Sequence, residues 1–359
     1  MSSYKKKKSA NSQSKPNRKR RIFIYGVLAL IVLIATLFTV YLFLPATSFS
    51  ASEKIIIIRS NETCPDAFLK KMRKEAIIQD EQTFKQVADL LNIWPRLQPG
   101  KFRIQKNSGL LTIVMLFRKN KQLTNKLVIQ KIRTKEQFAR LVSQSLECGE
   151  TEFLRFITNK DSLLRFGLNT ETLLSVIFPD TYYFKWDASP SDILEKLQSE
   201  QIKFWTEARI SRAEKLGITP IQAYILASIV EEETLIAEDK PLIASVYLNR
   251  YKKNMNLGSC PTVKFALRDF GLRRILSEHI LRAGNSPYNT YKFAGLPPGP
   301  ICTPSRETLK AVLEAEETEY LYFCAKANSG GRHAFAKTYE EHMENARLYQ
   351  KWLNEKKIR

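Results

Sequence analysis

Apolar residues fill one stretch near the N-terminus and then recur at regular spacing through the rest of the chain. Residues 22–44 read IFIYGVLALIVLIATLFTVYLFL, 23 residues without a charge, which is long enough for a helix to cross a bilayer. A cleaved signal peptide is the alternative interpretation, but its apolar region is usually much shorter. The pattern therefore predicts one membrane-spanning helix followed by a folded region.

The segment from residue 50 to residue 150 alternates between strand-like and helix-like patterns. Its predicted strands are 55–60, 97–104 and 127–133, and its predicted helices are 65–76, 83–92, 109–118 and 134–146. Thr134 and Gln137 have the spacing of a capping box at the start of the last helix. The order strand, helix, helix, strand predicts a small α+β module similar to a peptidoglycan-binding LysM unit, and a generic α+β packing module fits equally well.

Residues 151–359 predict a larger, mixed α+β domain. Helical patterns cover 151–168 and 190–215, and the aromatic segment FPDTYYF (178–184) predicts a turn and a strand. A further helix is predicted over 238–250, with Asp239 and Pro241 at its start. The fold class is thus α+β, built as an N-terminal membrane helix, a small module and a second domain.

The distribution of charge predicts how the chain is oriented across the membrane. The net charge is +21, and residues 1–21 carry nine Lys or Arg and no acid, so the remainder holds about +12. A basic segment beside a spanning helix favours the cytoplasmic side. We expect residues 1–21 to be a cytoplasmic tail, 22–44 to cross the plasma (inner) membrane once, and everything past Pro45 to be extracytoplasmic. The remaining positive charge suits a polyanionic cell-surface polymer, although charge alone does not identify the partner. A nucleic-acid partner is disfavoured, because we expect the folded part to lie outside.

The cysteines and histidines form no cluster typical of a metal site. The five Cys (64, 148, 260, 302 and 324) contain no CxxC pair, and the three His (279, 333 and 342) are scattered. An odd number of thiols leaves at least one unpaired if disulfides form. We expect no metal, no cofactor and no disulfide framework.

The helix predicted from Pro220 onward ends unusually, in three consecutive acids. Thr219, Pro220 and Gln222 form a strong helix start, and residues 221–230 are apolar on all sides, which indicates a buried helix. The C-terminal end of a helix disfavours negative charge, and burial and neighbouring acids favour a protonated carboxyl. A protonated carboxyl at neutral pH is what a general acid needs.

The three acids, residues 231–233, point in different directions because successive helical residues are about 100° apart. Glu231 rises above Ala227 and Ser228, small residues that leave room for a ligand. We expect one acid to work, another to hold a neighbouring group and the third to be solvated. A wholly solvated acidic helix end is the alternative interpretation.

Later segments favour a sugar-binding cleft beside these acids. The loop AGLPPGPICTP (294–304) has four prolines and two glycines, which indicates a rigid shape, although a stiff surface loop would read the same way. Tyr288, Asn289 and Tyr291 supply aromatic faces and an amide. His333 either fixes a turn to the core or contacts substrate, and Tyr322 and Phe323 are interpreted as core strand positions.

Seven motifs in order resemble the endolytic murein transglycosylases, also called YceG-like proteins or the membrane-bound lytic transglycosylase G family. They are LASIVEEET (226–234), ASVYLNR (244–250), LGSCPTV (257–263), SPYNTY (286–291), GLPPGPI (295–301), YLYF (320–323) and the GGRHAF turn (330–335), with LQPGKFRI and FPDTYYF matching the N-terminal half. Three places depart from the family pattern. Cys260 stands where Asp is common, Cys302 where a small residue is usual, and Ser175-Val176 where Glu-Gly is common.

The resemblance implies lytic cleavage of peptidoglycan glycan strands between N-acetylmuramic acid and N-acetylglucosamine, with 1,6-anhydro ends that terminate strand elongation. It makes Glu231 the catalytic acid and Glu233 the family's second acid, while Glu232 stands where Lys is frequent. Residues expected to contact substrate are Glu233, Asn249, Arg250, Thr262, Tyr288, Asn289, Tyr291, Pro298 and His333. Peptidoglycan synthesis or division proteins are candidate partners. A non-catalytic membrane-anchored scaffold that binds peptidoglycan, and a hydrolytic glycosidase, are the alternative functions.

Overall fold

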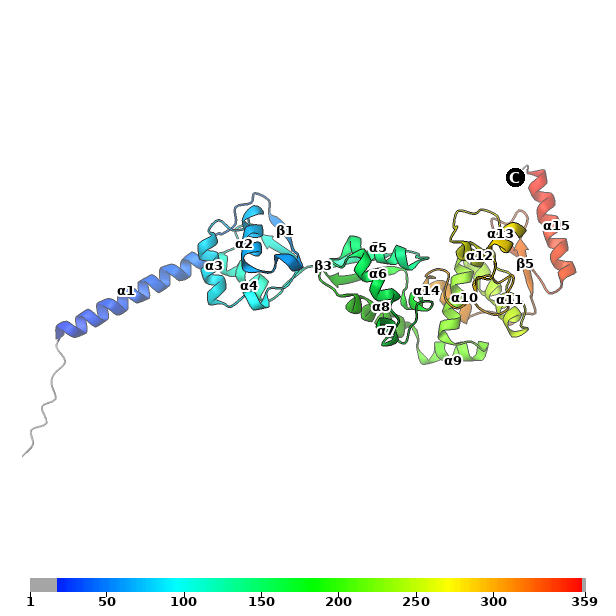
Figure 1. Cartoon of the computed structure of the whole chain (residues 1–359), viewed down its shortest axis with the longest axis horizontal. Helices are drawn as coiled ribbons and strands as arrows, with labels where there is room; N and C mark the ends of the chain where they lie inside the picture. Colours follow the sequence, from blue (N-terminus) through cyan, green and yellow to red (C-terminus); the bar gives the residue numbers. More distant parts are fainter. Residues whose placement is uncertain (1–17, 357–359) are drawn as a thin grey trace, which may run out of the picture. The chain divides into compact units, whose positions relative to one another are not determined.

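The computed structural model describes residues 18–356 and has a mixed α+β architecture. Two compact units divide between Leu123 and Thr124 (Figure 1). Most of the basic tail expected at residues 1–21 lies outside the described residues. The domain boundary expected near residue 150 falls inside the second unit, which takes in residues 124–150.

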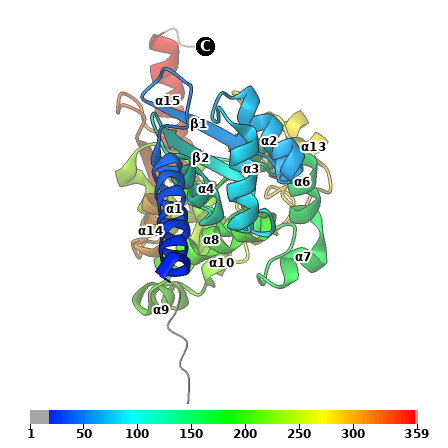
Figure 2. The same ribbon diagram turned by 90° about the vertical axis from the view of Figure 1, so that its left-hand side faces the viewer.

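Helix α1 (Arg18–Phe43) contains the long apolar stretch, and none of its residues is buried. Between residues 18 and 356 it is the one helix long and apolar enough to cross a membrane. The chain after it is tied to the start of α4 (Leu110–Arg118). Helix α1 contacts α4 (Figure 2). Pro45 forms an isolated bridge with Gly109, and the Ala46 amide donates to the Ser108 carbonyl at 3.0 Å. The end of α1 is therefore attached to the folded part of the first unit.

The rest of the first unit is a two-stranded sheet with helices around an aromatic core. Strands β1 and β2 pair antiparallel, from Glu53 opposite Gln105 to Ile58 opposite Gly100. Four buried phenylalanines, Phe68, Phe84, Phe102 and Phe117, contact one another in the core. The predicted order strand, helix, helix, strand is confirmed. In sequence the elements are β1 (Glu53–Ile58), the 3₁₀ helix η1 (Ser60–Glu62), α2 (Pro65–Lys74), α3 (Glu81–Leu90), η2 (Trp94–Arg96), β2 (Gly100–Gln105) and α4.

The second unit begins with another antiparallel pair of strands, β3 and β4. The predicted capping box at Thr134 is confirmed, because its hydroxyl accepts from the Gln137 amide at 3.2 Å. The strand predicted over 127–133 ends earlier, since Ile132 pairs with a distant loop. Its amide donates to Thr303 Oγ1 at 2.9 Å, and the Thr303 amide donates to the Ile132 carbonyl at 2.8 Å. These elements are β3 (Thr124–Ile129), α5 (Lys135–Ser145), α6 (Glu150–Thr158), α7 (Lys160–Leu164), η3 (Leu173–Val176), β4 (Asp180–Lys185) and α8 (Pro190–Phe204).

Two predicted helices are each divided in two by a polar capping residue. The segment 190–215 forms α8 and α9 (Glu207–Leu216), and Thr206 accepts from the Arg209 amide at 3.4 Å to begin the second helix. The segment 151–168 forms α6 and α7, with Asn159 accepting from the Ser162 amide at 2.9 Å. Such caps start a new helix without disturbing the apolar spacing, which is why periodicity alone missed them.

Helix α10 (Pro220–Glu233) lies at the centre of the second unit. The Thr219 hydroxyl accepts from the Gln222 amide at 3.3 Å, and the Gln222 side chain accepts from the Thr219 amide at 2.8 Å. Every residue from Ala223 to Val230 is buried, so the predicted all-round burial is confirmed. The other elements here are η4 (Ala237–Asp239), α11 (Lys240–Lys252), α12 (Cys260–Leu267), α13 (Ser277–Ala283) and α14 (Arg306–Leu313), of which α11, α12 and α14 pack against α10.

A hairpin and a helix complete the second unit. Strands β5 (Tyr322–Ala325) and β6 (His333–Ala336) pair antiparallel, and α15 (Tyr339–Glu355) follows. Gly330 and Gly331 adopt φ values of 66° and 95°, which few other residues tolerate, so the turn predicted before His333 is confirmed. Tyr322 and Phe323 are strand positions as expected, although both are half-buried.

Candidate active site

The last turn of α10 carries the three acids, and two other segments contact it there. They are the loop at 301–305 and the segment at 131–133. The small side chain of Ser228 allows the loop at 301–302 to lie directly on the helix. Ser228 Oγ accepts from the Ile301 amide at 3.0 Å, and the Cys302 thiol donates to the Ser228 carbonyl at 3.4 Å. Cys302 is fully buried, as expected for a packed thiol. The same loop continues to Ser305, which reaches the first acid.

Glu231 is held through one of its two carboxyl oxygens. Its Oε2 accepts from Lys240 Nζ at 3.2 Å, from Ser305 Oγ at 3.1 Å and from the Thr308 hydroxyl. Its Oε1 has no hydrogen-bond partner among residues 18–356 and is not enclosed. The side chain is 16% exposed. A proton carried by this carboxyl would therefore sit on Oε1, the oxygen that the three donors leave free.

Glu232 is bound between two cations, which corrects the expectation that one of the three acids is solvated. Arg133 lies 2.9 Å and Lys131 2.9 Å from its carboxylate, and the side chain is 16% exposed. Burial raises the pKa of Glu232, but the hydrogen bonds and charges of Arg133 and Lys131 outweigh burial and leave the pKa below its usual value. Glu232 is thus an ionised anchor for the segment around residues 131–133.

Glu233 lies in a third environment, with two hydroxyl donors and no ion-pair partner among residues 18–356. Tyr247 donates to its Oε1 at 2.6 Å and Ser259 at 2.7 Å. Burial raises the pKa of Glu233, and these two hydrogen bonds, together with more distant His333 and Lys264, lower it by less. The protonated carboxyl that the sequence predicts at this helix end is therefore favoured at Glu233.

This raised pKa predicts how stability should depend on pH. Above the usual value of 4.5 the unfolded chain releases the Glu233 proton while the folded chain keeps it. The contribution of Glu233 to the free energy of unfolding is therefore fully present below pH 4.5 and is lost as pH rises through the raised pKa of the folded state. Glu233→Gln has no proton to lose and keeps an acceptor for Tyr247 and Ser259, so its melting temperature should fall less between pH 4.5 and pH 7. Thermal unfolding of both proteins across that range checks this.

Glu238→Gln is the matched control, because the Glu238 side chain is 67% exposed. It should reproduce the wild-type pH dependence. Equal pH dependence for wild type and Glu233→Gln would contradict the environment assigned to Glu233.

Asn249 and Arg250 face the protein rather than a cavity. Asn249 Nδ2 donates to the carbonyls of Thr318 at 2.8 Å and Tyr320 at 3.0 Å. Arg250 Nε donates to the Leu321 carbonyl at 2.6 Å, and its guanidinium lies over the Tyr322 ring. Their donors hold the segment that leads into β5.

Thr262 and Tyr291 join the start of α12 to the loop at 288–291, since Thr262 Oγ1 lies 2.8 Å from Thr290 Oγ1, and Asn289 ties that loop to α13. Thr262 Oγ1 donates to the Ser259 carbonyl at 2.8 Å, and Asn289 Nδ2 donates to the Ile280 carbonyl at 3.1 Å. The Tyr291 hydroxyl lies 3.2 Å from the sulfur of Cys260, the position where the family commonly has Asp.

His333 ties the β5–β6 hairpin to the start of α11. Its Nδ1 lies 2.8 Å from Asp239 Oδ2, and its backbone amide donates to the same oxygen at 2.7 Å. Asp239 directly precedes Lys240, the cation on Glu231. Of the two roles considered for His333, these contacts favour the one in which it fixes a turn to the core over the one in which it contacts substrate.

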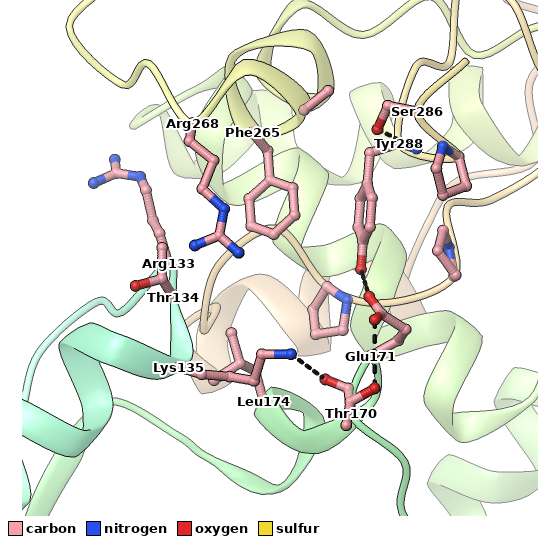
Figure 3. Close-up of a pocket in the computed structure, with 14 residues that line it drawn as sticks. Arg133, Thr134, Lys135, Thr170, Glu171, Leu174, Phe265, Arg268, Ser286 and Tyr288 are labelled. Atoms are coloured by element: carbon pink, nitrogen blue, oxygen red, sulfur yellow. Dashed lines mark hydrogen bonds between the residues drawn. The ribbon is translucent and has the colours of Figure 1, made fainter. Parts of the chain in front are cut away.

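Tyr288 and Pro298 do line a cavity, of about 500 Å³ (Figure 3). The Tyr288 hydroxyl points at Glu171 and donates to it at 2.7 Å, and Arg268 extends beside the ring of Phe265. Burial and the hydrogen bond to Glu171 both raise the pKa of Tyr288, so the phenol stays protonated. The other lining residues, none of which the sequence analysis named as a substrate contact, are Arg133, Thr134, Lys135, Thr170, Glu171, Leu174, Phe265, Ala266, Arg268, Ser286, Pro287 and Pro300.

Several separate segments bring these side chains together, and no spacing in the sequence connects them. The carboxyl group of Glu232 links the cavity to the helix end, because its partner Arg133 is a lining residue. The proline-rich loop makes a second link, with Pro298 and Pro300 at the cavity and Ser305 on Glu231. Within residues 18–356, no group of three or more His, Cys, Asp or Glu side chains is placed to hold a metal ion.

Comparison with known proteins finds one matching family and several relatives of the chain. The model of the YceG-like family matches residues 56–348. The endolytic murein transglycosylase of Bacillus subtilis is 38% identical over 181 residues, and that of Streptococcus pneumoniae serotype 2 is 29% identical over 213 residues. These alignments cover 50% and 59% of this chain but 49% and 37% of the relatives, so the chain spans about half or less of their length. A crystal structure of a YceG-like protein from Listeria monocytogenes matches with a TM-score of 0.52 and 25% identity, over 82% of this chain and 99% of that one.

Proposed function

The chain belongs to the YceG-like family, and we propose that it is a lytic transglycosylase that cuts peptidoglycan glycan strands internally. The cut falls between N-acetylmuramic acid and N-acetylglucosamine and leaves a 1,6-anhydro end. The names of the Bacillus and Streptococcus relatives support this reaction. The observation that carries the proposal is the geometry of Glu231, with one oxygen fixed by three donors and the other free of donors and not fully enclosed.

The reaction needs one group that first gives and then takes a proton. Protonated Glu231 donates from Oε1 to the glycosidic oxygen, the bond from that oxygen to C1 of muramic acid breaks, and the glucosamine leaves as an alcohol. The resulting carboxylate accepts the proton of the muramic acid 6-hydroxyl, whose oxygen bonds to C1. Glu231 thus ends the reaction protonated, as it began, and neither water nor a second carboxylate takes part.

Three neighbours of Glu231 suit this cycle. Lys240, Ser305 and Thr308 keep Oε2 in one position in both protonation states, so Oε1 stays directed outward. The Lys240 ammonium, 13% exposed, stabilises the negative charge that appears once the proton has left. We assign these three residues to positioning, and Glu232 and Glu233 to bracing the helix end.

We propose that the 500 Å³ cavity binds part of the glycan strand. The rings of Tyr288 and Phe265 offer apolar faces to a sugar, and Arg268 and Lys135 offer charged donors. Muramic acid carries a lactyl carboxyl group, which is a suitable partner for these cations in strands stripped of peptide. Of the contact residues inferred from the sequence, Tyr288 and Pro298 fit a substrate role because they line the cavity. The remaining ones form hydrogen bonds within the protein that hold loops and helix ends in place.

Arg268→Asn should weaken binding of glycan strands without peptide. Asn tolerates the left-handed backbone of this position, φ 53°, and removes the guanidinium. We expect the strand concentration at half-maximal rate to rise about tenfold, the loss of one charge-assisted hydrogen bond, with little change in the maximal rate. Arg282→Ala, an exposed arginine on α13, is the control and should match the wild type. An unchanged half-saturating concentration in Arg268→Asn would exclude the cavity as a subsite.

We further propose that α1 anchors the chain in the membrane with its N-terminus cytoplasmic and both units extracytoplasmic. The apolar composition of α1 and the basic residues before it support this orientation. The first unit is proposed to hold peptidoglycan without doing chemistry, and its β1–α2–α3–β2 order supports a LysM-like role. Proteins of peptidoglycan synthesis or division remain proposed partners.

The length distribution of digested strands tests the proposed activity. Incubation of the full chain in detergent with long purified strands should convert them to fragments of intermediate length before any disaccharide accumulates. Unchanged lengths would indicate a binding scaffold, and early release of disaccharides alone would contradict internal cutting.

A further inference from the structure

A second cavity lies in the first unit, next to the end of α1. Its volume is about 460 Å³, within the usual range for small-ligand pockets. Phe43, the last residue of α1, lines it together with apolar side chains of α4, among them Leu111 and Met115. A pocket that opens beside a membrane helix can receive a molecule that is itself in the membrane.

The length of α1 puts this cavity at the membrane surface, if the helix crosses as proposed above. Twenty residues of helix span about 30 Å, the thickness of the hydrocarbon layer. Counting from Ile22, the layer ends near Tyr41, and Tyr is favoured at such an interface. Phe43 and the cavity then lie at the level of the lipid headgroups of the outer leaflet.

The rim of the cavity is basic. Arg103, Lys119 and Lys121 line it, and Lys119 and Lys121 are exposed and form no ion pair with residues 18–356. Arg103 lies 3.4 Å from Glu53, and both of these side chains are largely exposed. Basic residues are less common on the outer side of a membrane than on the cytoplasmic side. Two unpaired lysines over an apolar wall suit a ligand with a phosphate and a hydrocarbon chain.

We propose that this cavity binds an anionic phospholipid of the surrounding bilayer, with an acyl chain against Leu111 and Met115 and the phosphate between Lys119 and Lys121. The apolar wall continues from the apolar surface of α1, so a lipid reaches it without leaving the membrane. A bound lipid fixes the first unit against the bilayer surface and thereby limits the distance from the membrane at which strands are held. The proposal rests on α1 being a membrane anchor and is independent of the cleavage chemistry.

Photo-crosslinking of the full chain in nanodiscs tests this site. Photoactivatable phosphatidylglycerol should crosslink within residues 103–121, as mapped by mass spectrometry, and photoactivatable phosphatidylcholine should do so much less. Lys119→Ala with Lys121→Ala should reduce the crosslinks about fivefold for each lysine, the usual effect of a basic residue near an anionic surface. Lys70→Ala with Lys74→Ala is the control and should change nothing, because both lysines are exposed on α2 and neither forms an ion pair within the described part of the chain.

A second variant separates a pocket from simple attraction to a charged surface. Leu111→Gln with Met115→Gln leaves every charge in place but makes the wall polar, so it should also lower crosslinking within residues 103–121. Equal crosslinking in this variant, in the lysine variant or with phosphatidylcholine would overturn the lipid site. Failure of the chain to enter nanodiscs would overturn the anchor and the lipid site together, while cleavage of soluble strands would be unaffected.

Discussion

Replacing Glu231 with Gln is expected to lower the rate of strand cleavage by as much as about 10⁴-fold. General acid–base assistance is typically worth about 10²–10⁴-fold, and here one residue serves in both roles. Gln keeps an oxygen to accept from Lys240, Ser305 and Thr308, but it has no proton to donate. The initial rate of new strand ends, measured with purified glycan, gives the ratio directly.

Two further variants separate catalysis from folding in this experiment. Glu231→Gln leaves the mostly buried Lys240 without its ion-pair partner, which lowers stability. Glu231→Gln combined with Lys240→Met removes both charges, so it should melt closer to the wild type and be equally inactive. Glu238→Gln, a change at an exposed acid nearby, should keep full activity. Wild-type rates in Glu231→Gln would remove this residue from the mechanism.

Gly299→Ala is expected to disrupt the cavity and destabilise the second unit. A Cβ at this position would lie 2.1 Å from the backbone oxygen of Glu171 and 3.0 Å from the Tyr288 hydroxyl. Backbone cannot swing aside as a flexible side chain can, so the proline-rich loop must move away from residue 171. Overpacking of this kind costs about 1–3 kcal/mol, and a misplacement of about 1 Å near a site can cost about 10²-fold in rate.

Thermal unfolding and cleavage rates of the same protein preparation check both effects. The matched control is Gly149→Ala, because nothing lies within 4 Å of the added Cβ and the backbone has φ −68°. That variant should match the wild type in melting temperature and rate. A Gly299→Ala protein with normal stability and activity would show that the close contact between the loop and residue 171 is not needed.

Local sequence signals predicted the backbone elements well. The capping boxes at Thr134 and Thr219, the buried helix after Pro220 and the glycine turn before His333 all formed as expected. Each depends on interactions within a few residues, and such interactions are encoded by spacing. The divided helices at Asn159 and Thr206 show the limit, since a capping residue can interrupt a helix while the apolar period continues.

The environments of the three acids could not be predicted in the same way. Sequence spacing gave their different directions, but their partners come from distant parts of the chain. Glu232 is kept ionised by Arg133 and Lys131, which lie 99 and 101 positions before it in the sequence. Glu231 is bound by Ser305 and Thr308, which lie more than 70 positions after it. None of the three acids is solvated, because each has partners from other segments. A local sequence pattern does not reveal such partners.

The same reason explains which site residues the sequence found. Tyr288 and Pro298 stood out because an aromatic motif and a proline-rich loop are local features, and both line the cavity. Lys135, Glu171 and Arg268 belong to no motif, and only the fold brings them together. Asn249 and Thr262 were chosen as polar members of motifs, yet Asn249 donates to the backbone carbonyl of Thr318 and Thr262 donates to that of Ser259.

The chemical identity of the new strand ends tests the central claim most directly. Strands digested by the full chain in water enriched in ¹⁸O should be analysed by mass spectrometry. A lytic reaction through Glu231 predicts 1,6-anhydro-muramic acid ends without any ¹⁸O, because the 6-hydroxyl closes the ring and water takes no part. Reducing muramic acid ends that carry ¹⁸O would contradict this account and identify the enzyme as a hydrolase.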